Sequence, residues 1–359
     1  MVPKVRFKGF TDEWEQRKLG DVTDIKTGSR NHQDSVENGK YPFFVRSEKI
    51  ERLDEYDFDT TAILIPGDGR IGEIFHYYDG KFALHQRVYK VDNFNGIDAL
   101  FLLSLFRYSF RRHALRLNAQ GTVPSLRLPM FTKWEILLPK LEEQEKIGQL
   151  FQSLDKTITL HEEQHRQLER LKKALLQKMF ADETGYPALR FKGFTEKWEQ
   201  SYLKDIASVN SGRDYKHLNK GNIPVYGTGG YMLSVDKALS NTKDGIGIGR
   251  KGTINNPYIL KAPFWTVDTL FYVIPYNVDL NFLYGIFQKI DWRKKDESTG
   301  VPSLSKENIN KTKFKIPAIS EQKEIGTIFQ NLDTLITLHQ HKIDNLKRLK
   351  RALLQKMFV

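Results

Sequence analysis

One short segment of this chain carries the residue types of a zinc hydrolase. Residues 161–165 read His-Glu-Glu-Gln-His, a pattern that on a helix places two imidazoles and a general-base carboxylate around a metal ion. A second, similar segment has His339, Gln340 and Ile343 at the corresponding positions, so the base and the second ligand are lost there. We therefore interpret the match as accidental and expect no metal site. The two histidines are expected to form a polar layer on a helix-packing face.

A second pattern is related to DNA-adenine methyltransferases. The glycine-rich run 245–249, followed by Asn256-Pro257-Tyr258, resembles their cofactor loop and their Asn/Asp-Pro-Pro-Tyr/Phe catalytic turn. One proline is missing. The two elements are also too close together to bracket the βαβ units that a nucleotide-type cofactor needs. The pattern therefore argues against a methyltransferase that acts alone.

A Gly-Arg-x-Gly segment occurs twice, at residues 69–72 and 249–252. We align the two segments, so that Arg70 matches Arg250. Such a turn brings backbone close to a ligand and projects a guanidinium group, which suits a phosphate or the edge of a guanine. A hairpin turn with a solvated arginine would explain the same pattern, and both interpretations stay open. Lys251, next to Arg250, is a candidate phosphate contact.

Composition favours a polyanionic partner and excludes thiol chemistry. The formal net charge is +12, and lysine and arginine gain affinity for nucleic acid by releasing counterions from phosphates. The second half of the chain is the more basic one. Without cysteine there are no disulfides, no thiolate nucleophile and no cysteine zinc site. No apolar run approaches the roughly 18 residues of a membrane span, and no signal peptide is recognisable, so we expect a cytoplasmic protein.

These segments belong to a chain that repeats itself. The edges of the two copies agree and their interiors diverge. A period of about 180 residues is far longer than a solenoid repeat, so each copy is expected to fold around its own core. The matching pairs are 6–11 (Arg-Phe-Lys-Gly-Phe-Thr) with 190–195, Trp14 with Trp198, and 143–180 with 321–358.

Each copy ends in a segment that predicts one long helix. Residues 141–180 and 319–359 carry apolar residues at spacings of three and four, which is typical of coiled coils. We expect the two helices to pair antiparallel within the chain. Leu171 and Leu349 share the spacing. The predicted coiled-coil interface consists of Ile147, Phe151, Leu154, Ile158, Leu168, Leu175, Ile325, Phe329, Leu332, Ile336, Leu346 and Leu353.

The remaining segments predict a mixed α/β (α+β) fold. Residues 1–140 and 188–318 are expected to form two pseudo-two-fold-related globular domains, joined by the long helices and by a Gly- and Pro-containing linker at 181–187. Gly-Thr-Val-Pro-Ser-Leu at 121–126 and Gly-Val-Pro-Ser-Leu at 300–304 are predicted turns. Apolar runs bounded by turns lie at 41–45, 61–66, 81–91, 245–248 and 264–274, and helical stretches lie at 98–112 and 279–290.

The ordered motifs together resemble the specificity subunit of type I restriction-modification systems. Each domain follows Arg-Phe-Lys-Gly-Phe-Thr and Trp-Glu-Gln, and precedes Glu-Gln-x-x-Ile-Gly and a helix that ends Ala-Leu-Leu-Gln-Lys-Met-Phe. The resemblance covers nearly the whole chain. It implies two target recognition domains, each reading one half of a bipartite, asymmetric DNA site, on a chain that has no catalytic activity. It also implies two methyltransferase subunits and motor/nuclease subunits as partners, with S-adenosylmethionine, ATP and Mg bound by those partners.

The candidate DNA contacts lie in both domains. Two other classes remain as alternatives: a stand-alone DNA-modifying enzyme, either an adenine methyltransferase or a nuclease, and a coiled-coil adaptor that does not touch DNA. The adaptor would be favoured if the basic residues were dispersed. The candidate contacts are Arg46, Arg70 and Arg87 in the first domain and Arg213, Lys216, Arg250 and Lys251 in the second.

Overall fold

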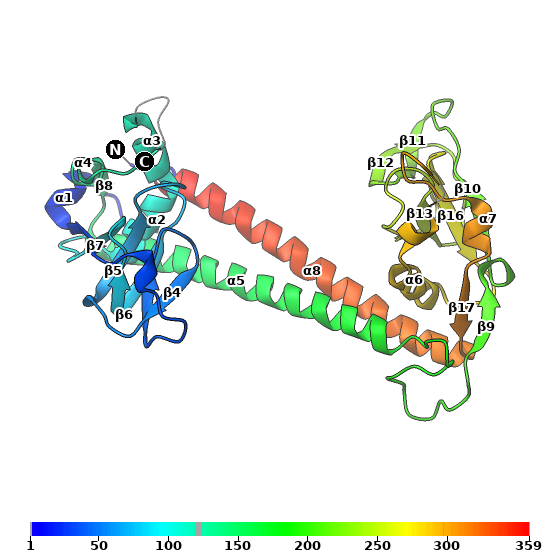
Figure 1. The fold of residues 1–359 in the computed structure, drawn as a ribbon. Helices are drawn as coiled ribbons and strands as arrows, with labels where there is room; N and C mark the ends of the chain where they lie inside the picture. Colours follow the sequence, from blue (N-terminus) through cyan, green and yellow to red (C-terminus); the bar gives the residue numbers. More distant parts are fainter. Residues whose placement is uncertain (1, 119–123, 297, 359) are drawn as a thin grey trace. The chain divides into compact units, whose positions relative to one another are not determined.

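The chain divides into two compact units. The computed structural model describes residues 2–118, 124–296 and 298–358 (Figure 1). Unit 1 contains Met1–His161 and His341–Val359, and unit 2 contains Glu162–Gln340. Each unit holds one globular domain and part of both long helices, α5 (Leu141–Lys178) and α8 (Ile319–Met357). Among the residues described, no helix is long and apolar enough to cross a membrane.

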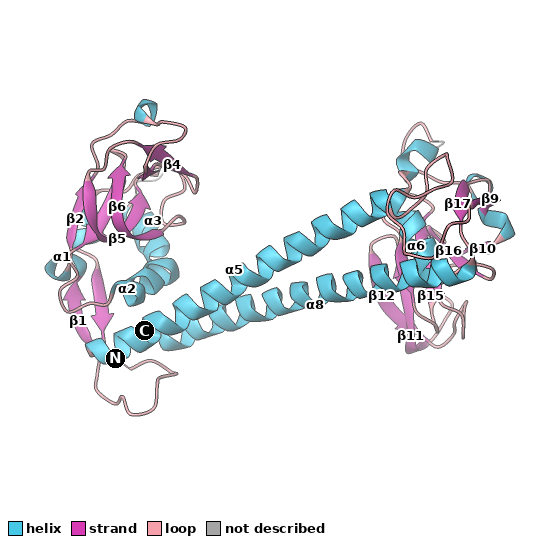
Figure 2. Ribbon diagram, turned by 90° about the horizontal axis from the view of Figure 1, so that it is seen from below, coloured by secondary structure: helices cyan, strands magenta, loops and turns pink. Residues whose placement is uncertain are grey.

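The domain of unit 1 is built on one six-stranded sheet, in the order β2-β7-β5-β6-β3-β4. All neighbours are antiparallel except β3 and β6, which run parallel. Central strand β5 is buried over its second half, and Ile63 and Ile65 pack with Phe101 and Phe106 of the helical segment that follows β7. Figure 2 shows these strands side by side, with α2 beside them. The elements are β1 (Glu15–Lys18), α1 (Leu19–Val22), β2 (Asp24–Thr27), η1 (His32–Asp34), β3 (Tyr41–Phe44), β4 (Ile50–Leu53), β5 (Phe58–Pro66), β6 (His76–Leu84), β7 (Val88–Asp92), α2 (Ala99–Leu105), π-helical η2 (Phe106–Phe110), α3 (Arg111–Leu117), α4 (Leu128–Thr132) and β8 (Glu135–Leu138), which pairs with β1.

The domain of unit 2 repeats this order with one break. Its sheets run β10-β16-β13-β14 and β12-β11-β15, so the strand equivalent to β6 is split into β14 and β15. Pro263, which follows a cis peptide bond, lies between the two pieces and has no backbone N–H to donate to a ladder. The elements are β9 (Glu199–Tyr202), η3 (Leu203–Asp205), β10 (Ala207–Ser211), β11 (Lys220–Gly227), β12 (Gly230–Val235), β13 (Gly245–Gly249), β14 (Tyr258–Leu260), β15 (Trp265–Thr266), β16 (Leu270–Pro275), α6 (Leu280–Lys289), η4 (Trp292–Lys295), α7 (Lys306–Asn310) and β17 (Lys313–Ile316), which pairs with β9.

The structure confirms the mixed α/β fold and corrects two predicted runs. The apolar run at 81–91 is two strands, β6 and β7, separated by a turn at 85–87. The run at 264–274 likewise divides into β15 and β16. Each run is interrupted by polar residues that mark the turn, His85-Gln86-Arg87 in the first and Asp268-Thr269 in the second.

The long helices pair antiparallel within each unit. In unit 1 the first half of α5 meets the end of α8, where the ring centroids of Phe151 and Phe358 are 5.9 Å apart. Lys350 pairs there with Asp155. In unit 2 the end of α5 meets the first half of α8, where Lys172 pairs with Asp333. The predicted antiparallel coiled coil is therefore present in both units.

The predicted interface residues differ in how deeply they lie. Six of them are buried, and Leu154, Leu168, Leu175 and Leu353 pack partly buried against the two cores, whereas Ile336 and Leu346 are partly exposed. Leu171 and Leu349, which share the apolar spacing, are each 48% exposed and lie outside this interface. The inward face of α5 near its end follows Leu168, Lys172 and Leu175, with the aliphatic stem of Lys172 covered. The six buried residues are Ile147, Phe151, Ile158, Ile325, Phe329 and Leu332.

The repeated motifs at the edges are explained by packing inside each unit. The buried carboxylate of Glu143 accepts two hydrogen bonds from Arg6, at 2.7 and 2.8 Å. The side chain of Gln144 accepts from Asp98 N at 2.9 Å and donates to the carbonyl of Pro139. A Cβ on Gly148 would lie 2.5 Å from the Asp98 carboxylate, so this position requires glycine.

Unit 2 repeats the same contacts. Arg190 donates twice to buried Glu321, and Gln322 accepts from Asp279 N at 3.0 Å. A Cβ on Gly326 would lie 2.3 Å from the Asp279 carboxylate. The repeated edge motifs therefore build the same set of contacts in each unit, which we call the frame. In unit 1 it holds the N-terminus of α2 against α5, and in unit 2 it holds the N-terminus of α6 against α8.

Candidate nucleic-acid interface

Three loops in each unit meet at one end of the central strand. In unit 1 the loop at 67–75, after β5, is bonded to the segment before α4, since Leu126 N donates to Gly67 O at 2.6 Å. In unit 2 the loop at 250–257, after β13, is bonded in the same way, since Leu304 N donates to Arg250 O at 2.9 Å. The third loop is the turn after β3 or β11, at 45–49 and 228–229.

Strand pairing fixes which residues of these loops are equivalent. Pro66 ends β5 opposite Val88, and Gly249 ends β13 opposite Leu270. The following residue donates its N–H to the neighbouring turn in both units: Gly67 at 2.7 Å and Arg250 at 2.8 Å. Pro66 and Gly249 are therefore equivalent positions.

This register shows that the expected match of Arg70 with Arg250 is wrong. Arg250 occupies the place of Gly67, and Lys251 occupies the place of Asp68. Lys251 forms an isolated bridge with Ser303, and Asp68 forms the equivalent bridge with Ser125. The two Gly-Arg-x-Gly segments are thus three residues out of step. The place of Arg70 is taken by a threonine in unit 2, so the two arginines cannot do the same work in the two loops.

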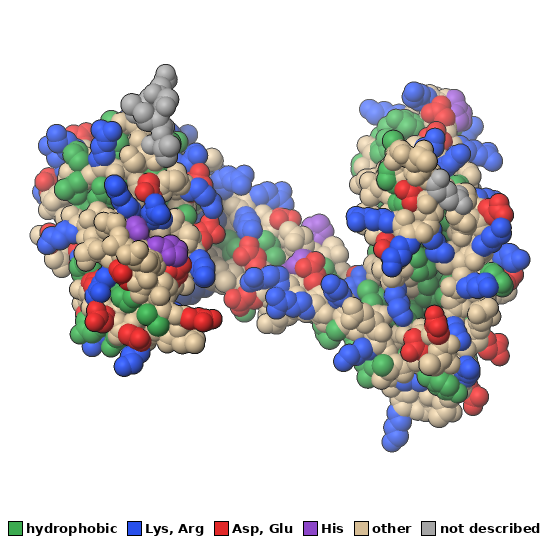
Figure 3. Space-filling model, viewed as in Figure 1, with side chains coloured by type: hydrophobic (Ala, Val, Ile, Leu, Met, Phe, Trp, Pro, Cys, Tyr) green, Lys and Arg blue, Asp and Glu red, His purple; other side chains and the backbone are tan. Residues whose placement is uncertain are grey.

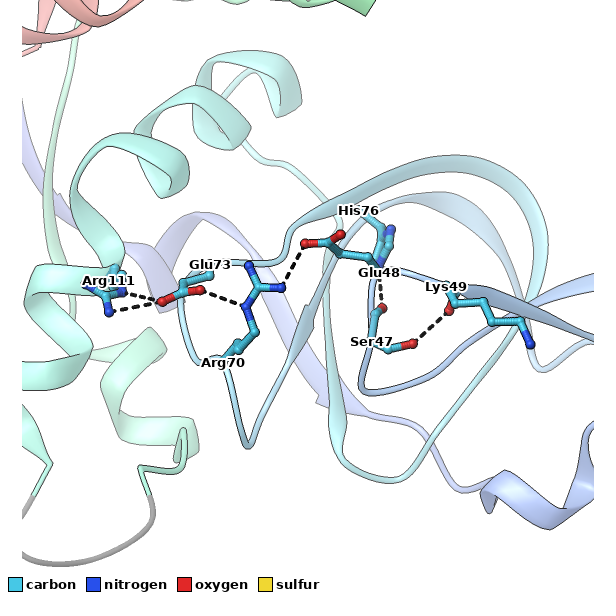
Figure 4. A network of polar contacts seen from close by, with 7 residues as sticks. All are labelled: Ser47, Glu48, Lys49, Arg70, Glu73, His76 and Arg111. Atoms are coloured by element: carbon cyan, nitrogen blue, oxygen red, sulfur yellow. Dashed lines mark hydrogen bonds and ion pairs between the residues drawn. The ribbon is translucent and has the colours of Figure 1, made fainter. Parts of the chain in front are cut away.

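Arg70 lies in a network of exposed ion pairs that joins two loops of unit 1 (Figure 4). Its guanidinium donates to Glu73 at 2.9 Å and to Glu48 at 3.1 Å, and Glu73 also accepts from Arg111 at 3.0 Å. The hydrogen bond that Arg70 donates to Glu73 lowers the pKa of Glu73 and raises the pKa of Arg70. Arg46 pairs with Asp68 at 3.4 Å beside this network. To contact a base or a phosphate, Arg70 and Arg46 must exchange these partners.

Arg87 lies on the turn between β6 and β7 and is oriented by buried His85. The backbone N–H of Arg87 donates to His85 Nδ1 at 2.9 Å. Burial lowers the pKa of His85, which keeps the imidazole neutral and able to accept this bond. The guanidinium of Arg87 is exposed, and within the described ranges no ion pair involves it. Arg87 is therefore the predicted contact of unit 1 that is most available to a ligand.

The predicted contacts of unit 2 are all exposed cations. The guanidinium of Arg250 lies 5.7 Å from the ring centroid of Phe271, and Lys251 is next to it in the loop. Arg213 is held by its backbone, which donates to Thr266 O at 2.9 Å. Together with Lys216, these side chains make no ion pair in the part of the chain that the structure describes. Unit 2 thus offers unpaired positive charge where unit 1 has a neutralised network.

Comparison with known proteins identifies the family. The model of the type I restriction modification DNA specificity domain matches residues 11–170 and 195–348. The chain belongs to this specificity family. It is 25% identical to the EcoDI specificity subunit of Escherichia coli over 396 aligned positions, which cover 96% of this chain and 88% of that protein. It is 22% identical to the MjaVIII specificity subunit of Methanocaldococcus jannaschii, with 96% and 91% covered.

The fold of this family member agrees with a solved structure. The type I restriction-modification S subunit of M. genitalium superposes with a TM-score of 0.82 at 20% identity, covering 100% of this chain and 99% of that one. The family model matches each domain together with most of the long helix that follows it. The sequence resemblance to a specificity subunit is therefore confirmed.

Charge alone does not locate the DNA-binding face of this specificity subunit. Figure 3 shows lysine and arginine side chains spread over both units, with acidic side chains among them. Such dispersal would by itself favour a coiled-coil adaptor, and it is the match of both domains to a DNA specificity model that argues against that alternative.

Each unit also has a basic run in the segment before its Pro-Ser-Leu turn that is absent from the predicted contacts. Arg111 is tied to the loop at 67–75 through Glu73, and Trp292 N donates to Asn255 of the equivalent loop at 2.8 Å. The runs are Arg111, Arg112 and Arg116 in unit 1 and Arg293, Lys294 and Lys295 in unit 2. Their clustering before the repeated turn was the available signal.

Proposed function

We propose that each unit of this specificity subunit reads one half of a bipartite, asymmetric DNA site. The observation that carries the proposal is the contrast at equivalent loop positions. Asp68, paired with Arg46, stands in unit 1 where unit 2 has unpaired Lys251. Loops that differ in charge on one structural frame suit the recognition of two different half-sites, since base edges are read by a few side chains.

In this proposal the chain has no catalytic activity and works as a scaffold. Two methyltransferase subunits bind the two equivalent frames, and motor/nuclease subunits complete the complex. S-adenosylmethionine, ATP and Mg are bound by those partners. A duplicated frame supports two copies of one partner, because residues such as Glu143 and Glu321 have the same surroundings in both units.

The test is a methylome of cells that express this chain with its partner subunits. We expect one bipartite motif, and replacing residues 188–318 by the second domain of a relative should change only one half of it. A change in both halves, or in neither, would refute separate readers. A methylation assay of the purified chain alone tests the alternative, since activity without partners would identify a stand-alone enzyme.

A further inference from the structure

Two glycines of unit 2 meet neither of the two steric conditions that require glycine. A fold requires glycine where φ is left-handed or where a Cβ would clash. Among the glycines in the described ranges, only Gly229 and Gly300 have no left-handed φ and no atom within 4 Å of a built Cβ. Gly229 lies in the turn between β11 and β12, and Gly300 lies in the loop between η4 and α7. A reason outside the chain remains: the close approach of a partner.

Exposed apolar side chains stand beside both glycines. Tyr231 is 63% exposed, Met232 49% and Val301 66%. The turn at 228–229 carries no charge, and Thr228 is its only side chain that can form hydrogen bonds. Apolar surface presented at a narrow tip gains free energy when a partner covers it.

The hairpin tip and the charged loop of unit 2 share one edge of the domain. Tyr258, the first residue after the loop at 250–257, donates its hydroxyl to Gly227 O at 2.5 Å. In unit 1, strands β3 and β6 run parallel, and Phe44 pairs with Leu84. In unit 2, the equivalent strands β11 and β15 run parallel, and Tyr226 pairs with Thr266. This pairing makes Thr228 the equivalent of Arg46, which reaches Asp68 at 3.4 Å.

Thr228 and Lys251 are the equivalents of Arg46 and Asp68, so the tip and unpaired Lys251 lie at the same edge of the domain. The loop that carries Gly300 is bonded to the same segment, since Gly252 N donates to Pro302 O at 2.8 Å and Ser303 forms a bridge with Lys251. The edge therefore combines a cation for a phosphate with two glycine-bearing, apolar loop tips.

We propose that the β11–β12 tip enters the major groove of DNA, with the Gly229 backbone against base edges and Tyr231 and Met232 in apolar contact with the bases. The major groove admits a two-stranded β-ribbon, and its thymine methyl groups are apolar partners. Lys251 then holds the adjacent phosphate. This inference rests on the proposed reading of a half-site by unit 2, and it names the residues of closest contact.

The experiment adds volume at Gly229 in the complex of this chain with its methyltransferase partner. Specific affinity is measured by fluorescence anisotropy with a duplex carrying the methylated motif, and with one in which the unit 2 half-site is scrambled. Gly229→Ala should weaken binding to the full site roughly tenfold, the size of one mismatched base pair, and Gly229→Leu should weaken it further. Affinity for the scrambled duplex and the melting temperature should stay unchanged.

Asn241→Leu is the control, because it adds volume at an exposed position in the loop between β12 and β13, at the opposite end of these strands, and should leave the affinity for both duplexes unchanged. Wild-type affinity of both Gly229 variants for the full site would overturn the inference. So would an equal loss on both duplexes, or a loss of assembly with the methyltransferase in place of a loss of DNA binding. If the wild-type complex itself fails to distinguish the two duplexes, the proposed function is refuted before any variant is made.

Discussion

The two units share one frame but differ at the edge where their loops meet. In the frame, the arginine–glutamate pair, the glutamine contacts and the close-packed glycine of unit 1 all recur in unit 2. At the loop edge, unit 1 has an ion-pair network around Arg70, whereas unit 2 has unpaired Arg250 and Lys251 beside a glycine turn. Buried contacts tolerate little change, and exposed loops tolerate much. Duplication has therefore preserved the frame and left the loops free to diverge.

The largest expected effect is on stability, and it should differ between the helix-packing interfaces of the two units. Leu332 is buried in the core of unit 2, whereas Leu154 is only partly buried in unit 1. Leu332→Asp should destabilise its unit by about 5 kcal/mol or more, because it creates a cavity and buries an unpaired charge, and Leu154→Asp should cost about half of that. Hydrogen exchange with mass spectrometry measures the opening of each unit separately. Equal losses would show that the two interfaces are packed alike.

The frame should respond equally in the two units. Glu143→Ala and Glu321→Ala each leave a largely buried arginine, Arg6 or Arg190, without its carboxylate partner. Each should lower the free energy of unfolding of its unit by about 3–5 kcal/mol. The same exchange measurement reports the two values. A difference above about 1 kcal/mol would contradict the claim of one frame, since matched contacts should give matched losses.

DNA binding should depend on the two loops unequally. Arg250→Ala should weaken binding to the specific site by about 1–3 kcal/mol, and Lys251→Ala should lower the salt slope by about 1. Arg70→Ala should weaken binding less than Arg250→Ala does, because the Arg70 guanidinium must first leave two carboxylates. Anisotropy titrations at several salt concentrations give both quantities. A larger loss for Arg70 than for Arg250 would show that the network breaks open on DNA.

The smallest effect is a pH dependence confined to unit 1. The bond from Arg70 lowers the pKa of Glu73, so its contribution is fully present above the ordinary glutamate pKa of about 4.3 and is lost as pH falls through the lower, folded value. Hydrogen exchange of the loop at 67–75, corrected for intrinsic rates, should rise in that window. The loop at 250–257, which has no such network, is the internal control. Equal acceleration in both loops would point to general acid unfolding.

Several features could be predicted from the sequence because they depend on local pattern. The repeat follows from matching segments such as 6–11 and 190–195, and the long helices follow from apolar spacing. The recurring Glu-Gln-x-x-Ile-Gly motif indicated a shared edge, and the structure supplies its reason in Gly148 and Gly326, where the chain approaches itself too closely for a Cβ. The family resemblance depended on the same motifs.

What only the tertiary structure decided is the register of the loops. The two Gly-Arg-x-Gly segments match residue by residue in the sequence. The position of a loop residue, however, is set by strand partners that are distant in sequence: Val88 pairs with Pro66, and Leu270 pairs with Gly249. Those pairings shift the match by three residues and bring Lys251 onto the place of Asp68. Similarity of letters reports ancestry and local propensity, whereas the hydrogen-bonded ladder determines which side chains reach the same point in space.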